Sequence, residues 1–111
     1  MIRFVHDGRS IDYTPAQAVA AGDVVVQGEL VGIAKLAVAA NQLGALAVEG
    51  VFDFPKAAGA GSAITVGSNV YWDAGESVAK TDAEAGANKL IGKTVKAAAD
   101  ADTTVRVRLN Q

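Results

Sequence analysis

The stretch Thr103-Thr104-Val105-Arg106-Val107-Arg108-Leu109, close to the C-terminus, decides the fold class. Val105, Val107 and Leu109 alternate with polar or charged residues. This period of two is typical of an antiparallel strand that has one face in a core and the other in water. The sequence therefore predicts a β protein whose last strand is half-buried.

Similar short apolar runs precede this stretch, and most of them end at Gly, Asp or Asn, the residues that tight turns favour. The predicted strands cover residues 2–6, 10–13, 23–27, 30–34, 45–49, 51–54, 69–73, 77–80, 90–96 and 103–109. Asp7-Gly8, Gly28-Glu29 and Ala74-Gly75-Glu76 are predicted to close three hairpins. Gly50 marks a bulge or sharp bend, and Pro55 ends the run that follows it.

Three segments, 15–22, 57–63 and 81–88, lack this pattern, and we expect loops or single helical turns there. Thr81-Asp82-Ala83-Glu84 has the spacing of a capping box, so a short helix can begin there, although Gly86 soon interrupts it. The alanine-rich residues 36–40 fit either a helix or a strand.

A weak internal similarity links Gly22-Asp23-Val24, followed by Gly32-Ile33, to Ser68-Asn69-Val70, followed by Ile91-Gly92. It is too short to establish a repeat. The pattern predicts a mainly β fold, a small antiparallel β-barrel or sandwich built from hairpins with one or two short helical turns. We expect a single domain over residues 1–111, in which residues 1–20 form an arm or a hairpin.

Composition narrows the class of protein. The 111 residues are enough for one core, and ten Lys and Arg are interspersed with twelve Asp and Glu. A nucleic-acid-binding protein concentrates its cations, whereas Lys89, Lys93 and Lys96, and Arg106 with Arg108, are interpreted as solvated strand faces. The lack of cysteine excludes disulfides and thiolate metal sites. We expect no signal peptide and no membrane span, and therefore a soluble protein.

One segment, Ala87 to Thr94, fits a relaxed phosphate-loop pattern with Ala in place of the first Gly. A working phosphate loop needs a flexible turn between a buried strand and the N-terminus of a helix. Here Leu90 and Ile91 occupy the turn, and the residues after Thr94 are strand-like. We interpret the match as accidental; a nucleotide-dependent recombination factor that relies on Lys93 and Thr94 is the weaker alternative.

His6 is the only histidine, and this residue type can act as a general base or a metal ligand. Asp7 is adjacent to it, and Asp12 can return across the predicted hairpin. Because no nucleophile accompanies these residues, a surface histidine is favoured over a catalytic one.

Two acidic pairs, Asp82 with Glu84 and Asp100 with Asp102, have the i, i+2 spacing of calcium ligands. Neither belongs to a complete calcium-binding loop with a closing glutamate, so solvated loop acids are favoured. The sequence therefore predicts no catalytic residue, no cofactor site and no metal site, and no enzymatic activity.

Tyr71 and Trp72 are consecutive, so on a strand one ring points into the core and the other outward. An outward aromatic ring can anchor an interface or cover its own hairpin, and both interpretations remain open. The candidate interface residues are Phe4, Tyr13, Tyr71 and Trp72.

Several segments occur in an order that points to a protein family. These segments are residues 22–28, 32–34, 48–56, 67–73, 90–92 and 103–110. Their order resembles a family of small tailed-phage and prophage proteins, the capsid cement or head decoration proteins. This family was formerly a domain of unknown function, sometimes labelled recombinase-like. The resemblance covers nearly the whole chain, although residues 37–44 do not match the family clearly.

The resemblance implies a structural virion protein on the capsid exterior, made in the host bacterial cytoplasm. It implies binding to the major capsid protein, so that neighbouring subunits are tied together against internal DNA pressure. It also implies a homo-oligomer, with a trimer favoured, no catalytic residues, and no direct contact with nucleic acid or membrane. Met1 to Tyr13 could serve as an arm that adds to a partner's sheet. The alternative is a non-catalytic phage or bacterial adaptor.

Overall fold

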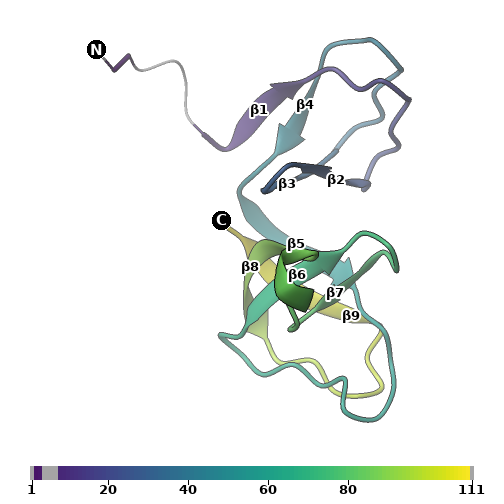
Figure 1. The fold of residues 1–111 in the computed structure, drawn as a ribbon, viewed down its shortest axis with the longest axis vertical. Coiled ribbons are helices and arrows are strands. Elements are labelled where there is room, and N and C mark those ends of the chain that lie inside the picture. Colours follow the sequence, from purple (N-terminus) through teal and green to yellow (C-terminus); the bar gives the residue numbers. More distant parts are fainter. Residues whose placement is uncertain (1, 4–7, 111) are drawn as a thin grey trace. The chain divides into compact units, whose positions relative to one another are not determined.

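The computed structural model describes residues 2–3 and 8–110. These residues form a mainly β fold with two antiparallel sheets, which confirms the predicted fold class (Figure 1). Neither sheet closes into a barrel within the described residues. The strands are β1 (Ser10–Tyr13), β2 (Val24–Gln27), β3 (Leu30–Ile33), β4 (Gly44–Ala47), β5 (Gly50–Pro55), β6 (Asn69–Asp73), β7 (Val78–Lys80), β8 (Lys89–Lys96) and β9 (Thr104–Leu109).

The first sheet has the strand order β1-β4-β3-β2, and the second has the order β5-β9-β8-β6-β7. The chain groups into two compact units, Met1–Val25 with Gly32–Glu49, and Val26–Val31 with Gly50–Gln111. The single domain expected over residues 1–111 stays a prediction.

Several predicted turns are confirmed. Gly28-Glu29 joins β2 to β3, and Gly28 takes the positive φ of +60° that favours glycine. Residues 74–77 join β6 to β7, which pair antiparallel from Tyr71↔Lys80 to Asp73↔Val78. Gly50 has a φ of +133° at the start of β5, which lies in the region that favours glycine.

The predicted first hairpin is not observed as such. Its first strand, residues 2–6, falls mostly on residues that lie outside those described, and Ile2 and Arg3 belong to no strand. β1 pairs instead with β4, from Ser10↔Ala47 to Tyr13↔Gly44. Residues 10–13 are thus part of a sheet, and the arm stays a prediction for the residues before them.

The loop segments also match their prediction in outline. Glu84–Gly86 forms a short 3-10 turn, but Thr81 does not cap it. Instead, Asp82 Oδ1 accepts a hydrogen bond of 2.8 Å from the Glu84 N–H. The ambiguous residues 36–40 are a loop that makes one β-bridge, between Val19 and Val38.

The second unit contains most of the large buried side chains. Phe54 packs against Trp72 with a ring-centroid distance of 6.1 Å, and both rings are buried. The buried hydrophobic residues of this part are Val31, Phe54, Ile64, Val70, Trp72, Ala79, Ile91, Ala98, Val105, Val107 and Leu109. Among the described residues of the first unit, the buried hydrophobic ones are Ile33, Ala34, Val38, Leu46 and Ala47, and Pro15 is also fully buried.

The two sheets are built on one repeated pattern. The order β1-β4-β3-β2 corresponds to β5-β9-β8-β6, with β7 as an addition. In the first sheet the Gly22 N–H donates to the Ala34 carbonyl, and in the second the Gly67 N–H donates to the Thr94 carbonyl. The bridge Val19↔Val38 likewise has its counterpart in another bridge, Ile64↔Ala98.

This repeat explains the weak similarity in the sequence. The sequence similarity aligns Gly22 with Ser68, whereas the hydrogen bonds align it with Gly67, one residue earlier. Gly22 corresponds to Gly67, and Gly32 corresponds to Gly92. A Cβ at Gly32 would lie 2.9 Å from the Leu46 Cβ, and one at Gly92 would lie 1.9 Å from a backbone oxygen of β9. The same close approach of neighbouring strands therefore requires glycine in both sheets.

Candidate interaction site

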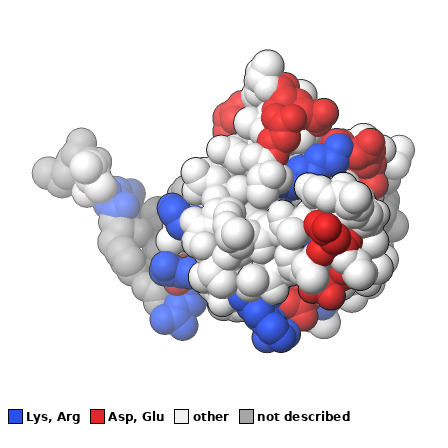
Figure 2. Space-filling model, turned by 90° about the horizontal axis from the view of Figure 1, so that it is seen from below, with Lys and Arg blue, Asp and Glu red and all other residues white. Residues whose placement is uncertain are grey.

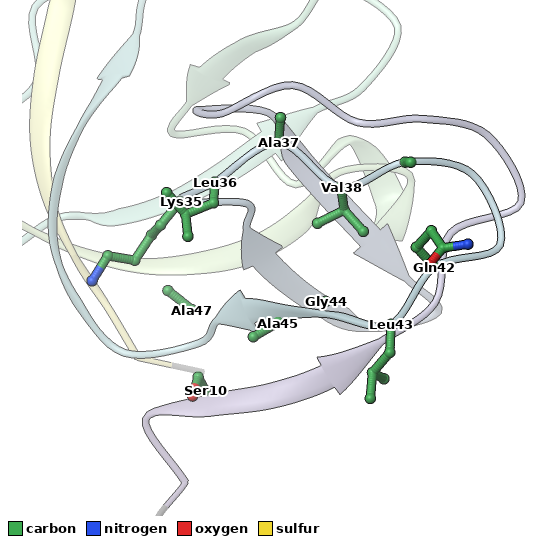
Figure 3. Close-up of a pocket in the computed structure, with 11 residues that line it drawn as sticks. Ser10, Lys35, Leu36, Ala37, Val38, Gln42, Leu43, Gly44, Ala45 and Ala47 are labelled. Atoms are coloured by element: carbon green, nitrogen blue, oxygen red, sulfur yellow. The ribbon is translucent and has the colours of Figure 1, made fainter.

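The first unit contains an open hollow with a volume of about 800 Å³ (Figure 3). Ser10, Ala45 and Ala47 come from the paired strands β1 and β4, and Leu36, Val38 and Leu43 come from the loop that joins β3 to β4. Most of this lining is apolar.

Small residues on β4 create the hollow. Ala45 and Ala47 line it, whereas the intervening Leu46 is fully buried on the other face of the strand. Leu36 and Leu43 are 78% and 71% exposed, respectively, although they are large apolar side chains. This combination of an alanine floor and exposed leucine walls is typical of a contact surface.

The repeat places a second hollow at the corresponding position of the second unit, with a volume of only about 180 Å³. It is lined by charged groups, and Arg106 donates two hydrogen bonds, of 2.9 and 3.2 Å, to the Asp53 carboxylate. The hydrogen bonds that Arg106 donates hold the pKa of Asp53 below its ordinary value, and the same bonds to the Asp53 carboxylate raise the pKa of Arg106. An ion pair of the chain itself therefore lines this smaller hollow.

Register identifies what has changed between the two hollows. Asp53 lies opposite Arg106 in the second sheet, and Asp12 lies opposite Ala45 in the first. Ala45 thus takes the position of the arginine, while the aspartate is retained. No ion pair joins Asp12 to another of the described residues.

A family model described as phage cement protein matches residues 5–109. The chain belongs to the phage cement protein family. This confirms the resemblance noted in the sequence and gives the protein a structural role in a phage. No curated protein and no solved structure matches the chain.

The predicted interface aromatics of this cement protein occupy different environments. Tyr13 is half-buried on β1, opposite Gly44, which lines the large hollow. Tyr71 is also half-buried, whereas Trp72 is only 6% exposed. Of the consecutive pair, tryptophan is therefore the core residue. Phe4 lies outside the described residues.

Among the described residues, the candidate metal-binding acids are not brought together. His6 and Asp7 lie outside the described residues. Asp100 Oδ1 accepts from the Ala63 N–H and Asp102 Oδ2 from the Ala99 N–H, both at 2.8 Å, so these acids shape loops. Within residues 2–3 and 8–110, no group of three or more His, Asp and Glu side chains could hold a metal ion.

The segment that fits the phosphate-loop pattern is mostly strand β8 of the cement protein. Gly92 and Thr94 are buried in it, and the Thr94 hydroxyl donates to the Thr65 carbonyl and accepts from the Ser68 N–H. Lys93 lies opposite Arg108 of β9. A strand in the middle of a sheet offers none of the free N–H groups that cradle a phosphate.

Cations of the cement protein are dispersed. On the face drawn in Figure 2, Lys and Arg side chains form separate groups among Asp and Glu. Lys89 lies 2.8 Å from Glu29, and both belong to the second unit. Lys80 pairs with Asp73 at 2.9 Å and with Glu76; these bonds raise the pKa of Lys80, and the Lys80 bond lowers that of Asp73. No helix of the described chain has the length and apolar character needed to span a membrane.

Sequence reasoning missed Lys56, which is only 5% exposed. Its Nζ donates to the Ser62 hydroxyl and to the carbonyls of Ala57, Ala99 and Asp102, at 3.0–3.1 Å. The ammonium thus fastens two loops of the second unit. A lysine directly after a strand-ending proline looks like a solvated residue, so no sequence signal marked it.

Proposed function

We propose that this protein binds the exterior of a phage head and stabilises the contacts between neighbouring major capsid subunits. The observation that carries the proposal is the match of the cement family over residues 5–109. The apolar hollow with its exposed Leu36 and Leu43 supports it, because a cementing protein needs a surface that gains from contact with another protein.

Strand edges supply a second means of attachment. β1 and β2 are the edges of the first sheet, and β5 and β7 are the edges of the second. An edge strand can pair with a strand or an extended arm of a partner protein. We propose attachment as a homo-oligomer, with a trimer favoured, because several simultaneous contacts release only when all of them fail together.

The role is structural, and we propose that it involves no catalysis, cofactor, direct nucleic-acid contact or membrane. The protein would be made in the cytoplasm of the host bacterium and would act on the outside of the virion. Among the candidate interface aromatics, Tyr13 and Tyr71 are proposed to touch the capsid, while the buried Trp72 holds its neighbour in place. Phe4 stays a candidate.

The test uses heads assembled without this protein from the major capsid protein of the same phage genome. Purified protein is added, and the bound amount is measured by sedimentation and gel densitometry. We expect saturable uptake in a fixed ratio to capsid subunits and a higher temperature of head disruption. Heads of an unrelated phage are the control. Absence of uptake by the matching heads would contradict the proposal.

The aromatic contacts can be tested in the same assay. Tyr71→Ser is expected to weaken uptake about tenfold, because an aromatic anchor at an interface carries on the order of 1–2 kcal/mol. The unfolding temperature of the free protein should change little, since Tyr71 is half-exposed. Tyr13→Ser provides the corresponding test beside the hollow, and unchanged uptake by both variants would remove these residues from the interface.

A further inference from the structure

We propose that the hollow of the first unit receives an arginine side chain from the bound partner, whose guanidinium pairs with Asp12. The inference rests on the proposed function for the identity of that partner, the major capsid protein. The evidence is the structural repeat, because the corresponding hollow of the second unit is lined by an arginine that pairs with an aspartate.

In the second unit the occupant comes from the same chain. Arg106 donates from Nε and Nη2 to the carboxylate of Asp53, its cross-strand neighbour. Lys96 and Val105 line the same hollow. An aliphatic stem beside the strand and a bidentate pair at its tip are the two features that arginine offers.

The first unit has the corresponding aspartate, Asp12, but it has Ala45 in place of the arginine. Asp12 and Ala45 are directly opposite, so their side chains lie on the same face of the sheet. That face is the one that Ala45 presents to the hollow. Asp12 is exposed and is the cross-strand neighbour of Ala45, which lines the hollow, although Asp12 itself is not among the lining residues. The carboxylate therefore lies beside the apolar space and not within it.

The remaining lining residues complete the change. Val38 and Ala98 are the corresponding bridge residues of the two units. Leu36 lies two positions before Val38, and Lys96 lies two positions before Ala98, so a leucine in the first hollow takes the place of a lysine in the second. An apolar wall suits the methylene stem of an incoming arginine, whereas a lysine at that position would repel its charge. The volume of about 800 Å³ exceeds one side chain, so residues beside the arginine are expected to contact Leu43 as well.

The one cation of the lining does not oppose this arrangement. Figure 3 shows the Lys35 ammonium at the opposite end of the hollow from Gln42 and Leu43. β1 runs from Ser10 toward the Leu43 end, which places Asp12 on that side of Ser10. Arginine is preferred to lysine because its planar fork matches a carboxylate with two hydrogen bonds.

The experiment measures uptake by heads that lack the protein, assembled from the major capsid protein of the same phage genome. Ala45→Arg places an arginine of the chain itself beside Asp12 and so blocks the hollow. Asp12→Asn removes the negative charge with which the partner's arginine would pair. Each is expected to raise the Kd for heads about tenfold or more, as expected when one partner of a buried charge pair is lost. Asp12→Glu should restore part of the affinity.

The matched control is Asp53→Asn, which disturbs the corresponding pair in the second unit and should leave the Kd within about twofold. Leu36→Lys is a second blocking variant at an exposed position, in case Ala45→Arg does not fold. Thermal unfolding checks each free protein.

The outcomes separate the inference from the proposed function. If wild-type protein binds heads but Asp12→Asn binds equally well, the arginine site is overturned and the cement role stands. If Ala45→Arg loses binding while Asp12→Asn keeps it, the hollow contacts the capsid without receiving an arginine, and the arginine site is again overturned. If wild-type protein fails to bind, both fail.

Discussion

The first and second sheets share their strand order and their hydrogen-bonding pattern, yet they differ in what fills them. Tyr13 of the first corresponds to Phe54 of the second, and only the phenylalanine is fully buried. Ala45 corresponds to Arg106, so one hollow is large and mostly apolar, whereas the other is smaller and is lined by an ion pair. The same backbone can therefore serve either a core or a contact surface.

The difference indicates a division of tasks. The second unit contains aromatic packing and the buried Lys56, both of which stabilise the fold, and a smaller hollow lined by an exposed ion pair. The first has fewer large buried side chains and exposes Leu36 and Leu43. We infer that stability resides mainly in the second unit and that the first gives up stability for a binding surface.

The largest expected effect comes from the two corresponding glycines. Gly92→Ala should destabilise the protein by more than about 3 kcal/mol, because its Cβ would overlap a backbone oxygen that cannot move freely. Gly32→Ala should cost about 1–3 kcal/mol, since its nearest obstacle is the Leu46 side chain at 2.9 Å. Urea unfolding measures both. Equal costs would contradict the difference in strand approach.

The next effect concerns Lys56, whose position in the first unit is taken by Pro15. Lys56→Met should lower the free energy of unfolding by about 2–4 kcal/mol, because it leaves the carbonyls and the Ser62 hydroxyl of the cage without their donor. Proteolysis in the 57–62 loop should accelerate. The exposed Lys96→Met is the control, with an expected change within about 0.5 kcal/mol. A similarly small change for Lys56→Met would mean that the hydrogen bonds donated by the Lys56 ammonium do not stabilise these loops.

A third prediction exchanges a packing pair between the sheets. The first sheet combines Val38 with Gly44, where an added Cβ would lie 2.5 Å from the valine, and the second combines Ala98 with Val105 at the corresponding positions. Gly44→Val alone should cost about 1–3 kcal/mol through overpacking.

Adding Val38→Ala to Gly44→Val should recover part of this loss, with a coupling energy of about 0.5–3 kcal/mol in a double-mutant cycle. Denaturant unfolding of the four proteins gives this value. Purely additive effects would show that the two positions do not share one space.

The smallest effect is expected from the exposed ion pair. Arg106→Ala should lower the unfolding midpoint only slightly, because both partners are about half exposed and solvent screens them. The pKa of Asp53 is lowered in the folded state, so the pair stabilises above the ordinary pKa of aspartate, and its contribution is lost as the pH falls through the folded pKa.

The difference in midpoint between wild type and Arg106→Ala should therefore disappear in acid. Ala45→Arg should introduce the same pH-dependent gain beside Asp12. A difference that persists in acid would point to lost packing of the arginine stem instead of the charge pair.

Much of the strand content was predictable from residues alone. Val105, Val107 and Leu109 mark one face of β9 by alternation, and Gly28-Glu29 marks a tight turn by its conformational preference. These signals are local, so they survive without knowledge of the rest of the chain. The choice between Tyr71 and Trp72 as the buried ring was not local and required the neighbouring Phe54.

The pairing of β1 with β4 could not be predicted, because Ser10 and Ala47 are distant in sequence and carry no matching signal. The repeat was detectable but displaced by one residue, since few residue identities survive between its copies. The hollow was invisible for a related reason. Its alanines look like ordinary small residues until the register shows that they replace an arginine.

The sequence by itself determined that the chain is β-rich, where most strands lie and to which family it belongs, since these depend on alternation, turn residues and a preserved order of segments. Tertiary structure alone decided which strands pair, that Lys56 is buried, and that Asp12 lies opposite Ala45 where Asp53 lies opposite Arg106. Pairing brings distant residues together, and the free energy of a contact depends on that neighbour as much as on the residue itself.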